Sequence, residues 1–298
     1  MESVLYNSRN NKNMVHTILL LLALIGLLGA IGYLLAGWSG SLFSSLAGIY
    51  LLTFRPHSGL DEQLRQLQAA PLPLHYHPQL NYLVHSMIRR AELSSAPRFY
   101  HIDRPEPNAF AIGTKDQAAI VLTDALLKNL NSREIAGIIG HELAHIRNND
   151  LQVLASADAI RRTLHSMATF AQILLLVLMP LAIVQGMTIP LMPLLLLVFA
   201  PSLGALLQLA ISRTREFEAD RTGAALAKDV FGLASALRKL ETAHTNMWRQ
   251  MVPAPWQIKP PLLLRSHPPT NERVQRLKEL GCETGQWPRH TELHSTVH

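Results

Sequence analysis

The amino-acid sequence predicts a mainly α-helical membrane protein, in which four transmembrane helices accompany a water-exposed α+β part with a small β-sheet. Two observations support this fold class. Long uncharged apolar runs alternate with stretches of ordinary soluble composition along the 298 residues. The soluble stretches combine helical periodicity with three short runs of strand-forming residues. We therefore expect a sizeable folded domain attached to a bilayer.

Four apolar segments, arranged in two pairs, are the candidate spans. Residues 14–36 are long enough to cross a bilayer, and residues 37–54 form a second, less hydrophobic segment after a very short connection. Cleavage of the first segment as a signal peptide is the competing interpretation, although its apolar core is long for one. The second pair is 163–187 and 188–212, and none of the four contains a charged residue. Each pair is predicted to form a helical hairpin.

Basic residues lie just before and just after each predicted hairpin, whereas the connection inside each hairpin carries no charge. These residues are Arg9, Lys12, Arg55, Arg161, Arg162, Arg213 and Arg215. By the positive-inside rule, the soluble part faces the cytoplasm. The formal net charge of +6 is thereby assigned to the membrane surface, so the lipid bilayer is the expected partner and nucleic acid is not.

These segments set the expected domain boundaries. Residues 1–55 form an N-terminal membrane hairpin, 56–162 and 213–281 form one cytoplasmic domain, 163–212 form an inserted membrane hairpin, and 282–298 form a polar tail. The single cysteine, Cys282, excludes an intramolecular disulfide.

Local patterns within the soluble part predict its elements. Strands are expected at 98–103, 108–112 and 118–122, the last two joined as a hairpin across 113–117. Thr123 is expected to cap a helix that runs to Asn129. Further helices are predicted at 78–91 and at 271–280, the second ended by Gly281.

The stretch from Arg133 to Asp150 carries the strongest functional pattern. Its apolar residues recur at helical spacing, which predicts a buried amphipathic helix. His141 and His145 lie one turn apart on one face of this helix and can bind one metal ion, while Glu142 can reach a water molecule on that metal. This His-Glu-x-x-His pattern is the signature of zinc peptidases. A helix with two surface histidines is the alternative.

A catalytic zinc ion takes three protein ligands, so a further donor is needed. Glu216 and Asp220 are four residues apart and share a helix face, while Glu218 points away from it. One of the two carboxylates could bind the metal and the other could hold a ligand imidazole by its second nitrogen. An ordinary charged helix start beside anionic lipid is the alternative. An even number of crossings within 163–212 would bring Glu216 back to the side of His145.

Four motifs together resemble the HtpX-like membrane zinc metallopeptidases, which are related to the type I CaaX prenyl endopeptidases. The motifs, in the order of that family, are N-A-F-A-I-G at Asn108, H-E-L-A-H at His141, E-F-E-A-D at Glu216 and S-H-P-P-T-N-E-R at Ser266. The resemblance extends from the first span to about Leu280. It implies that the cytoplasmic domain is a zincin-like metallopeptidase with one Zn²⁺ per chain.

The resemblance also implies roles for individual residues. Zinc would be bound by His141, His145 and Glu216, with Glu142 as the catalytic carboxylate. We expect His267 to stabilise the oxyanion of the reaction and Asp220 to hold a ligand imidazole. The strand of Asn108, Ala109, Phe110 and Ala111 is expected to pair with an extended substrate. The alternative is that this strand has a structural role only. Asn149 lies beyond His145 on the same predicted helical face and receives no role.

The function implied by the resemblance is endoproteolysis of unfolded or damaged membrane proteins at the cytoplasmic face of a bacterial plasma (inner) membrane. Three other functions compete with it. An intramembrane metalloprotease is disfavoured because Arg133, Glu134, Arg147 and Asp150 bracket the motif. Prenyl-protein processing ranks second, because the chain has only four candidate spans and no evident large chamber. A membrane-anchored scaffold or metal sensor would not need the Glu142 carboxylate.

Overall fold

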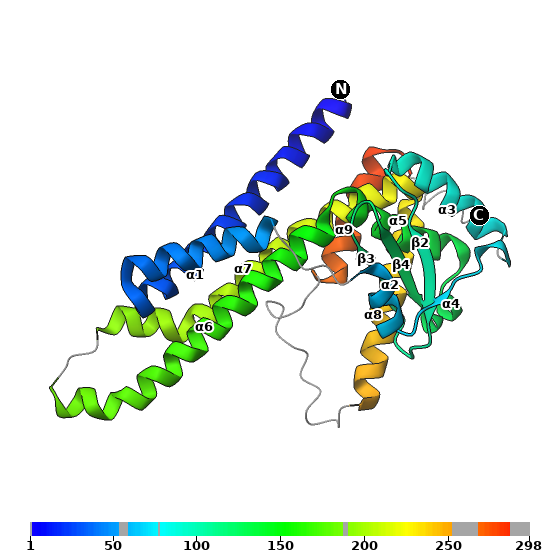
Figure 1. Cartoon of the computed structure of the whole chain (residues 1–298). Helices are drawn as coiled ribbons and strands as arrows, with labels where there is room; N and C mark the ends of the chain where they lie inside the picture. The colour runs from blue at the N-terminus through cyan, green and yellow to red at the C-terminus, as the bar shows by residue number, and fades with distance from the viewer. Residues whose placement is uncertain (1, 54–58, 77, 187–189, 252–267, 287–298) are drawn as a thin grey trace, which may run out of the picture. The chain divides into compact units, whose positions relative to one another are not determined.

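The computed structural model describes residues 2–53, 59–76, 78–186, 190–251 and 268–286 (Figure 1). His267 and residues 287–298 of the polar tail lie outside these residues. The described chain divides into two compact units. One is built from Met1–Pro56 and Gln152–Thr214, and the other from His57–Leu151, Arg215–Leu262 and residues 268–286.

The first unit contains the apolar helices. Within the described part of the chain, three helices are long and apolar enough to cross a membrane: α1 (Glu2–Thr53), α6 (Asp150–Val184) and α7 (Leu191–Ala227). Helix α1 is bent at Ala36 and Gly37, where the backbone leaves helical geometry and Gly37 adopts a φ of 62°. A side chain at Gly32 would collide with the Gly40 carbonyl group, so the two arms of α1 lie in close contact. The predicted hairpin of residues 14–54 thus takes the form of one sharply bent helix.

Among the described residues, the second unit combines short helices and the ends of two long ones with a small four-stranded sheet. Apart from the ends of α6 and α7, its elements are α2 (Leu60–Gln66), β1 (Ala70–Pro71), η1 (Leu74–Tyr76), α3 (Pro78–Ala91), β2 (Arg98–Ile102), β3 (Ala109–Gly113), β4 (Ala118–Thr123), α4 (Asp124–Asn129), α5 (Ser132–Arg147), α8 (Val230–Met251) and α9 (Thr270–Glu283). The sheet has the order β1-β2-β4-β3, with β2 parallel to β4 and both outer strands antiparallel to their neighbours.

Strand β4 is the centre of the sheet, and all six of its residues are buried. Ile120 and Leu122 point into the main core, which is shared with α3, α5, α8 and α9. Ala119 and Val121 alternate with them and face the smaller core formed with α2. Strand β3 lies at the edge of the sheet and pairs with β4 from Ala109 to Gly113, so the predicted hairpin is confirmed.

Helix α5 is fixed at its start and along its length. A capping box joins Asn131 and Glu134 at its N-terminus, and the buried Glu134 side chain also accepts hydrogen bonds from Ser235 and Lys239 of α8. A Cβ atom at Gly140 would lie 2.7 Å from the Gly223 carbonyl oxygen, which a larger residue could not approach. This contact brings α7 against the centre of α5.

Two sequence predictions need correction, and one short strand was not predicted. The predicted helix 133–150 ends at Arg147, because Asn149 adopts a φ of 58°, a left-handed conformation that asparagine tolerates, and α6 starts at Asp150. Helix α9 continues past Gly281 to Glu283, since Gly281 is a buried position within the helix. The two-residue strand β1 was not predicted, because a strand this short has no periodicity.

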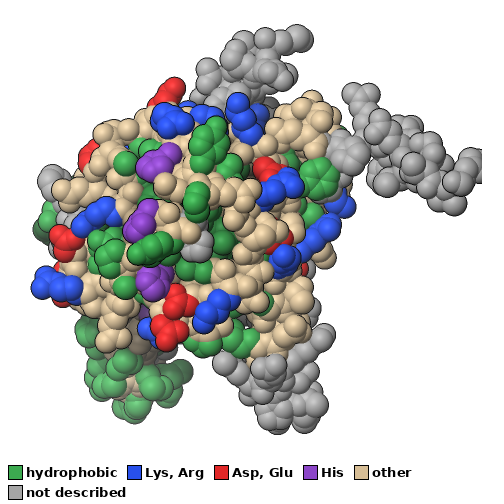
Figure 2. Space-filling view, turned by 90° about the vertical axis from the view of Figure 1, so that its right-hand side faces the viewer, with side chains coloured by type: hydrophobic (Ala, Val, Ile, Leu, Met, Phe, Trp, Pro, Cys, Tyr) green, Lys and Arg blue, Asp and Glu red, His purple; other side chains and the backbone are tan. Residues whose placement is uncertain are grey.

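Figure 2 shows one face of the molecule, on which Lys and Arg side chains are interspersed with Asp, Glu and hydrophobic side chains. Nucleic-acid binding requires positive charge gathered along one surface. On the face drawn, the described residues have no such arrangement.

Candidate active site

The structure brings His141, His145 and Glu216 together in the second unit. One ligand atom from each lies within 4.8 Å of the others, and all three residues are buried. His141 Nε2 is 3.5 Å from Glu216 Oε2, and His145 Nε2 is 3.8 Å from Glu216 Oε1. The histidines come from α5 and the glutamate from α7, which the contact between Gly140 and Gly223 holds together.

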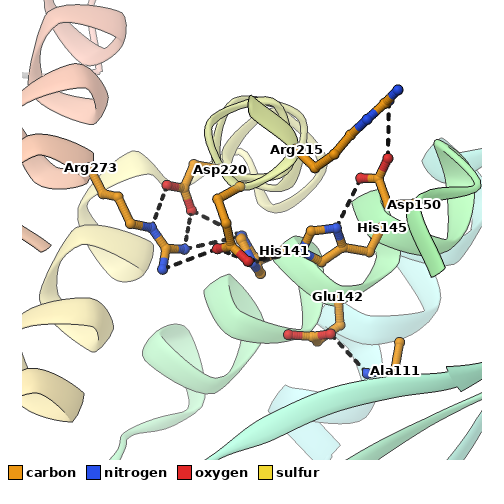
Figure 3. A network of polar contacts seen from close by, with 9 residues as sticks. Ala111, His141, Glu142, His145, Asp150, Arg215, Asp220 and Arg273 are labelled. Atoms are coloured by element: carbon orange, nitrogen blue, oxygen red, sulfur yellow. Dashed lines mark hydrogen bonds and ion pairs between the residues drawn. The ribbon is translucent and has the colours of Figure 1, made fainter. Parts of the chain in front are cut away.

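Each imidazole is oriented by a buried carboxylate. His141 Nδ1 is 2.9 Å from Asp220 Oδ1, and His145 Nδ1 is 2.9 Å from Asp150 Oδ2 (Figure 3). An ionised carboxylate can only accept a hydrogen bond, so both Nδ1 atoms must be the donors. The Nε2 atoms therefore carry the metal-binding lone pairs and face each other at 3.1 Å.

This donor set fits a divalent cation. Burial opposes a charge on His145, but the hydrogen bond to Asp150 and the nearby Glu142 and Glu216 carboxylates raise its pKa to about 9. These surroundings favour a positive charge beside the histidine pair, which a bound divalent cation would supply. With all side chains ionised, four carboxylates and two guanidinium groups leave a charge of about −2, which a divalent cation neutralises. The carboxylates and guanidinium groups are those of Glu142, Asp150, Glu216, Asp220, Arg215 and Arg273.

Glu142 lies between the metal-binding histidines and the edge of the sheet. Its Oε2 atom accepts a hydrogen bond of 2.9 Å from the backbone amide of Ala111 in β3. Burial raises the pKa of Glu142, while the neighbouring His141 and His145 partly oppose this rise. A carboxylate with a raised pKa is a stronger base than a free carboxylate.

The structure adds residues that sequence reasoning missed. Asp150 reaches His145 because the chain turns at Asn149, so a continuous helix would have carried this carboxylate away. Asn149, by the same turn, does not lie on the helical face where it was expected. Arg273 of α9 binds Asp220, and Arg215 of α7 binds Asp150. The arginine of the Ser-His-Pro-Pro-Thr-Asn-Glu-Arg motif was the one available signal for Arg273.

Asn108 is placed at the entrance to strand β3. Its backbone amide donates to Thr123 Oγ1, and its side-chain oxygen accepts from the Ala109 amide. Ala111 contacts Glu142, whereas no contact between the Asn108 side chain and the three metal-binding residues is recorded among the described residues.

A buried His-Glu-x-x-His helix, completed by a glutamate from a second helix, defines a zinc metallopeptidase. The sequence model of peptidase family M48 matches residues 75–281. The chain belongs to this family and, within it, to the HtpX homologues, as the four motifs predicted.

Three relatives of similar length support this assignment. The chain is 34% identical over 262 residues to the protease HtpX homolog of Salinibacter ruber, covering 84% of this chain and 91% of the relative. It is 32% identical over 290 residues to that of Ralstonia pickettii, covering 93% and 99%. It is 33% identical over 298 residues to that of Burkholderia thailandensis, covering 92% and 99%.

Among solved structures, the crystal structure of S. mikatae Ste24p is similar to this chain with a TM-score of 0.44 and 19% sequence identity. The match covers 91% of this chain and 66% of that protein. The family assignment rests on the sequence relatives. This chain is accordingly a multi-pass membrane metallopeptidase that acts on polypeptides.

Proposed function

We propose that the chain is an endopeptidase of a bacterial plasma membrane, which cleaves unfolded or damaged membrane proteins at the cytoplasmic face. The observation that carries this proposal is the position of Glu142, beside the three metal-binding residues and in contact with an edge strand. A metal-binding scaffold has no use for this carboxylate. A peptidase needs it to move protons.

The chemistry follows from the buried site. Zinc held by His141, His145 and Glu216 would supply a Lewis acid that lowers the pKa of water and polarises a peptide carbonyl. Glu142 takes a proton from the attacking water and later delivers it to the amine that leaves. Asp150 and Asp220 keep the imidazoles in the tautomer that presents Nε2. His267 is proposed to donate a hydrogen bond to the oxyanion.

Strand β3 is proposed as the surface that binds substrate. The Ala109 and Ala111 amides donate to Asn108 Oδ1 and Glu142 Oε2 rather than to β4. Alternate residues of an antiparallel strand point to the same side, so the outward groups of this strand face Glu142. An extended peptide added along this edge would place its backbone beside the carboxylate, whatever its sequence. This mode of binding favours unfolded segments.

A cleavage assay on the purified full-length protein tests the substrate class. We expect the zinc-loaded protein to degrade an unfolded casein and to spare a tightly folded protein of similar size. A zinc chelator should abolish cleavage, and added zinc should restore it, because the bound ion supplies the Lewis acid. Cleavage of a prenylated CaaX peptide without cleavage of casein would instead support the prenyl-processing alternative.

The proposed topology has four crossings, with the two arms of α1, α6 and α7 returning the chain to the cytoplasm. Cys282 tests it, because it is the only cysteine of the sequence and is exposed on α9. We expect a membrane-impermeant maleimide to label Cys282 in inverted membrane vesicles and not in intact spheroplasts. The Cys282→Ser variant gives the background. Labelling in spheroplasts alone would place α9 outside the cytoplasm and contradict the proposal.

A further inference from the structure

Two chains of charged groups with the same order lead to the metal-binding histidines. In one, Arg215 Nη1 lies 3.1 Å from Asp150 Oδ1, and the other oxygen of Asp150 holds His145 Nδ1. In the other, Arg273 binds Asp220, and Asp220 Oδ1 holds His141 Nδ1. Figure 3 shows the two arginines on opposite sides of the histidine pair. The Arg215–Asp150 contact and the Arg273–Asp220 contact differ in geometry.

Arg273 binds its carboxylate with both arms of the guanidinium fork. Its Nε atom lies 2.7 Å from Asp220 Oδ2, and its Nη2 atom lies 2.6 Å from Asp220 Oδ1. The third nitrogen, Nη1, is 3.3 Å from Glu216 Oε2. The Arg273 side chain is only 8% exposed, so these contacts are screened little by water. One guanidinium therefore touches a metal-binding carboxylate and the carboxylate that orients a metal-binding imidazole.

We propose that Arg273 is a positioning residue of the metal site, whose guanidinium fork fixes Asp220 against His141 and limits the movement of Glu216. This inference rests on the proposed zinc site. The fork matters because two parallel hydrogen bonds define the plane of the Asp220 carboxylate, whereas one bond leaves it free to rotate. With that plane fixed, Asp220 Oδ1 stays in line with His141 Nδ1.

The substitution of arginine by lysine separates geometry from charge. Lysine keeps the positive charge but is a compact ammonium that cannot form the planar two-point contact. At Arg273 this removes the fork, while the electrostatic repulsion between the side chain and a bound cation is retained. At Arg215 the same change replaces a single hydrogen bond to Asp150 that an ammonium can also make. The two substitutions should therefore differ in effect.

Arg276 provides a control on the same helix. Its guanidinium carbon lies 3.6 Å from the centre of the Phe217 ring of α7, and its Nη2 atom binds Glu272. Arg276 thus helps α9 to contact α7, as Arg273 does, but its side chain is 54% exposed and its recorded partners exclude the metal-binding residues. The Arg276→Lys variant therefore reports effects of α9 packing alone.

The test measures zinc affinity of the full-length protein in detergent by competition with a chelator. We expect Arg273→Lys to raise the zinc dissociation constant about tenfold, at the lower end of the 10- to 100-fold loss typical for partners of metal ligands. It should also shift the visible absorption bands of the Co²⁺-substituted protein, which report ligand geometry. Arg215→Lys should change both measurements less than Arg273→Lys does, because its single hydrogen bond to Asp150 can be kept, and Arg276→Lys should match the wild type.

Asp220→Asn extends the test, and the melting temperature of each metal-free variant shows whether it is folded. If Arg273 acts through Asp220, the double variant Arg273→Lys/Asp220→Asn binds zinc no more weakly than the single variant that has the lower zinc affinity. Additive losses would overturn the inference, and so would wild-type affinity and an unchanged Co²⁺ spectrum in Arg273→Lys. Absence of zinc binding by the wild type itself would refute the proposed function instead.

Discussion

The Glu142→Gln variant is expected to bind zinc with wild-type affinity and to lose proteolysis, with kcat/KM for an unfolded substrate falling about 10³-fold, within the range typical for loss of a general base. Glutamine has the shape of glutamate, and its amide oxygen can still accept the hydrogen bond from the Ala111 amide. The variant thus keeps the contact with β3 and removes only the ability to take and deliver a proton.

Glu134→Gln is the matched control for this experiment. Glu134 is also a buried glutamate of α5, but it contacts Ser235 and Lys239 rather than the metal-binding residues. The control loses a buried charge from the same helix, so its activity per folded, zinc-loaded molecule should equal that of the wild type. Equal activity of Glu142→Gln and Glu134→Gln would remove Glu142 from the proposed chemistry.

Local sequence patterns predicted the elements that hold the site. The apolar spacing within residues 133–150 predicted helix α5, although not its end, and the four-residue interval between His141 and His145 placed both imidazoles on one face. The β3–β4 hairpin and the Thr123 cap followed from turn and cap residues in the same way. These features depend on residues that are close together in the chain, so a single amino-acid sequence is enough to predict them.

The contacts that orient the site were not predictable, since they depend on a turn or on segments far apart in the chain. Asp150 is five residues from His145, yet their contact requires the left-handed turn at Asn149, which a helical pattern does not reveal. The partners Asp220 and Arg273 are 53 positions apart. The bond between Ala111 and Glu142 also depends on which edge of the sheet faces α5. Such pairings are set by packing of whole elements rather than by local propensity.

Glu216→Gln should show the other large effect, which is loss of the metal. The uncharged amide is a poor zinc ligand, and two histidines alone would remain of the three donors. Because loss of an outer partner already costs about 10- to 100-fold in affinity, we expect loss of a direct ligand to cost more than about 100-fold. Chelator competition and the zinc content of the purified protein measure this change.

Thermal unfolding provides an independent measurement of the same loss. At a zinc concentration 100 times the wild-type dissociation constant, binding stabilises the folded state by about 2.7 kcal/mol, whereas a 100-fold weaker site gains only about 0.4 kcal/mol. Added zinc should thus raise the melting temperature of the wild type and barely change that of Glu216→Gln. Glu218→Gln is the control, because Glu218 is a buried carboxylate of the same helix outside the three-residue cluster. If zinc stabilises Glu216→Gln as much as Glu218→Gln, the third ligand is a different residue, and α7 does not complete the site.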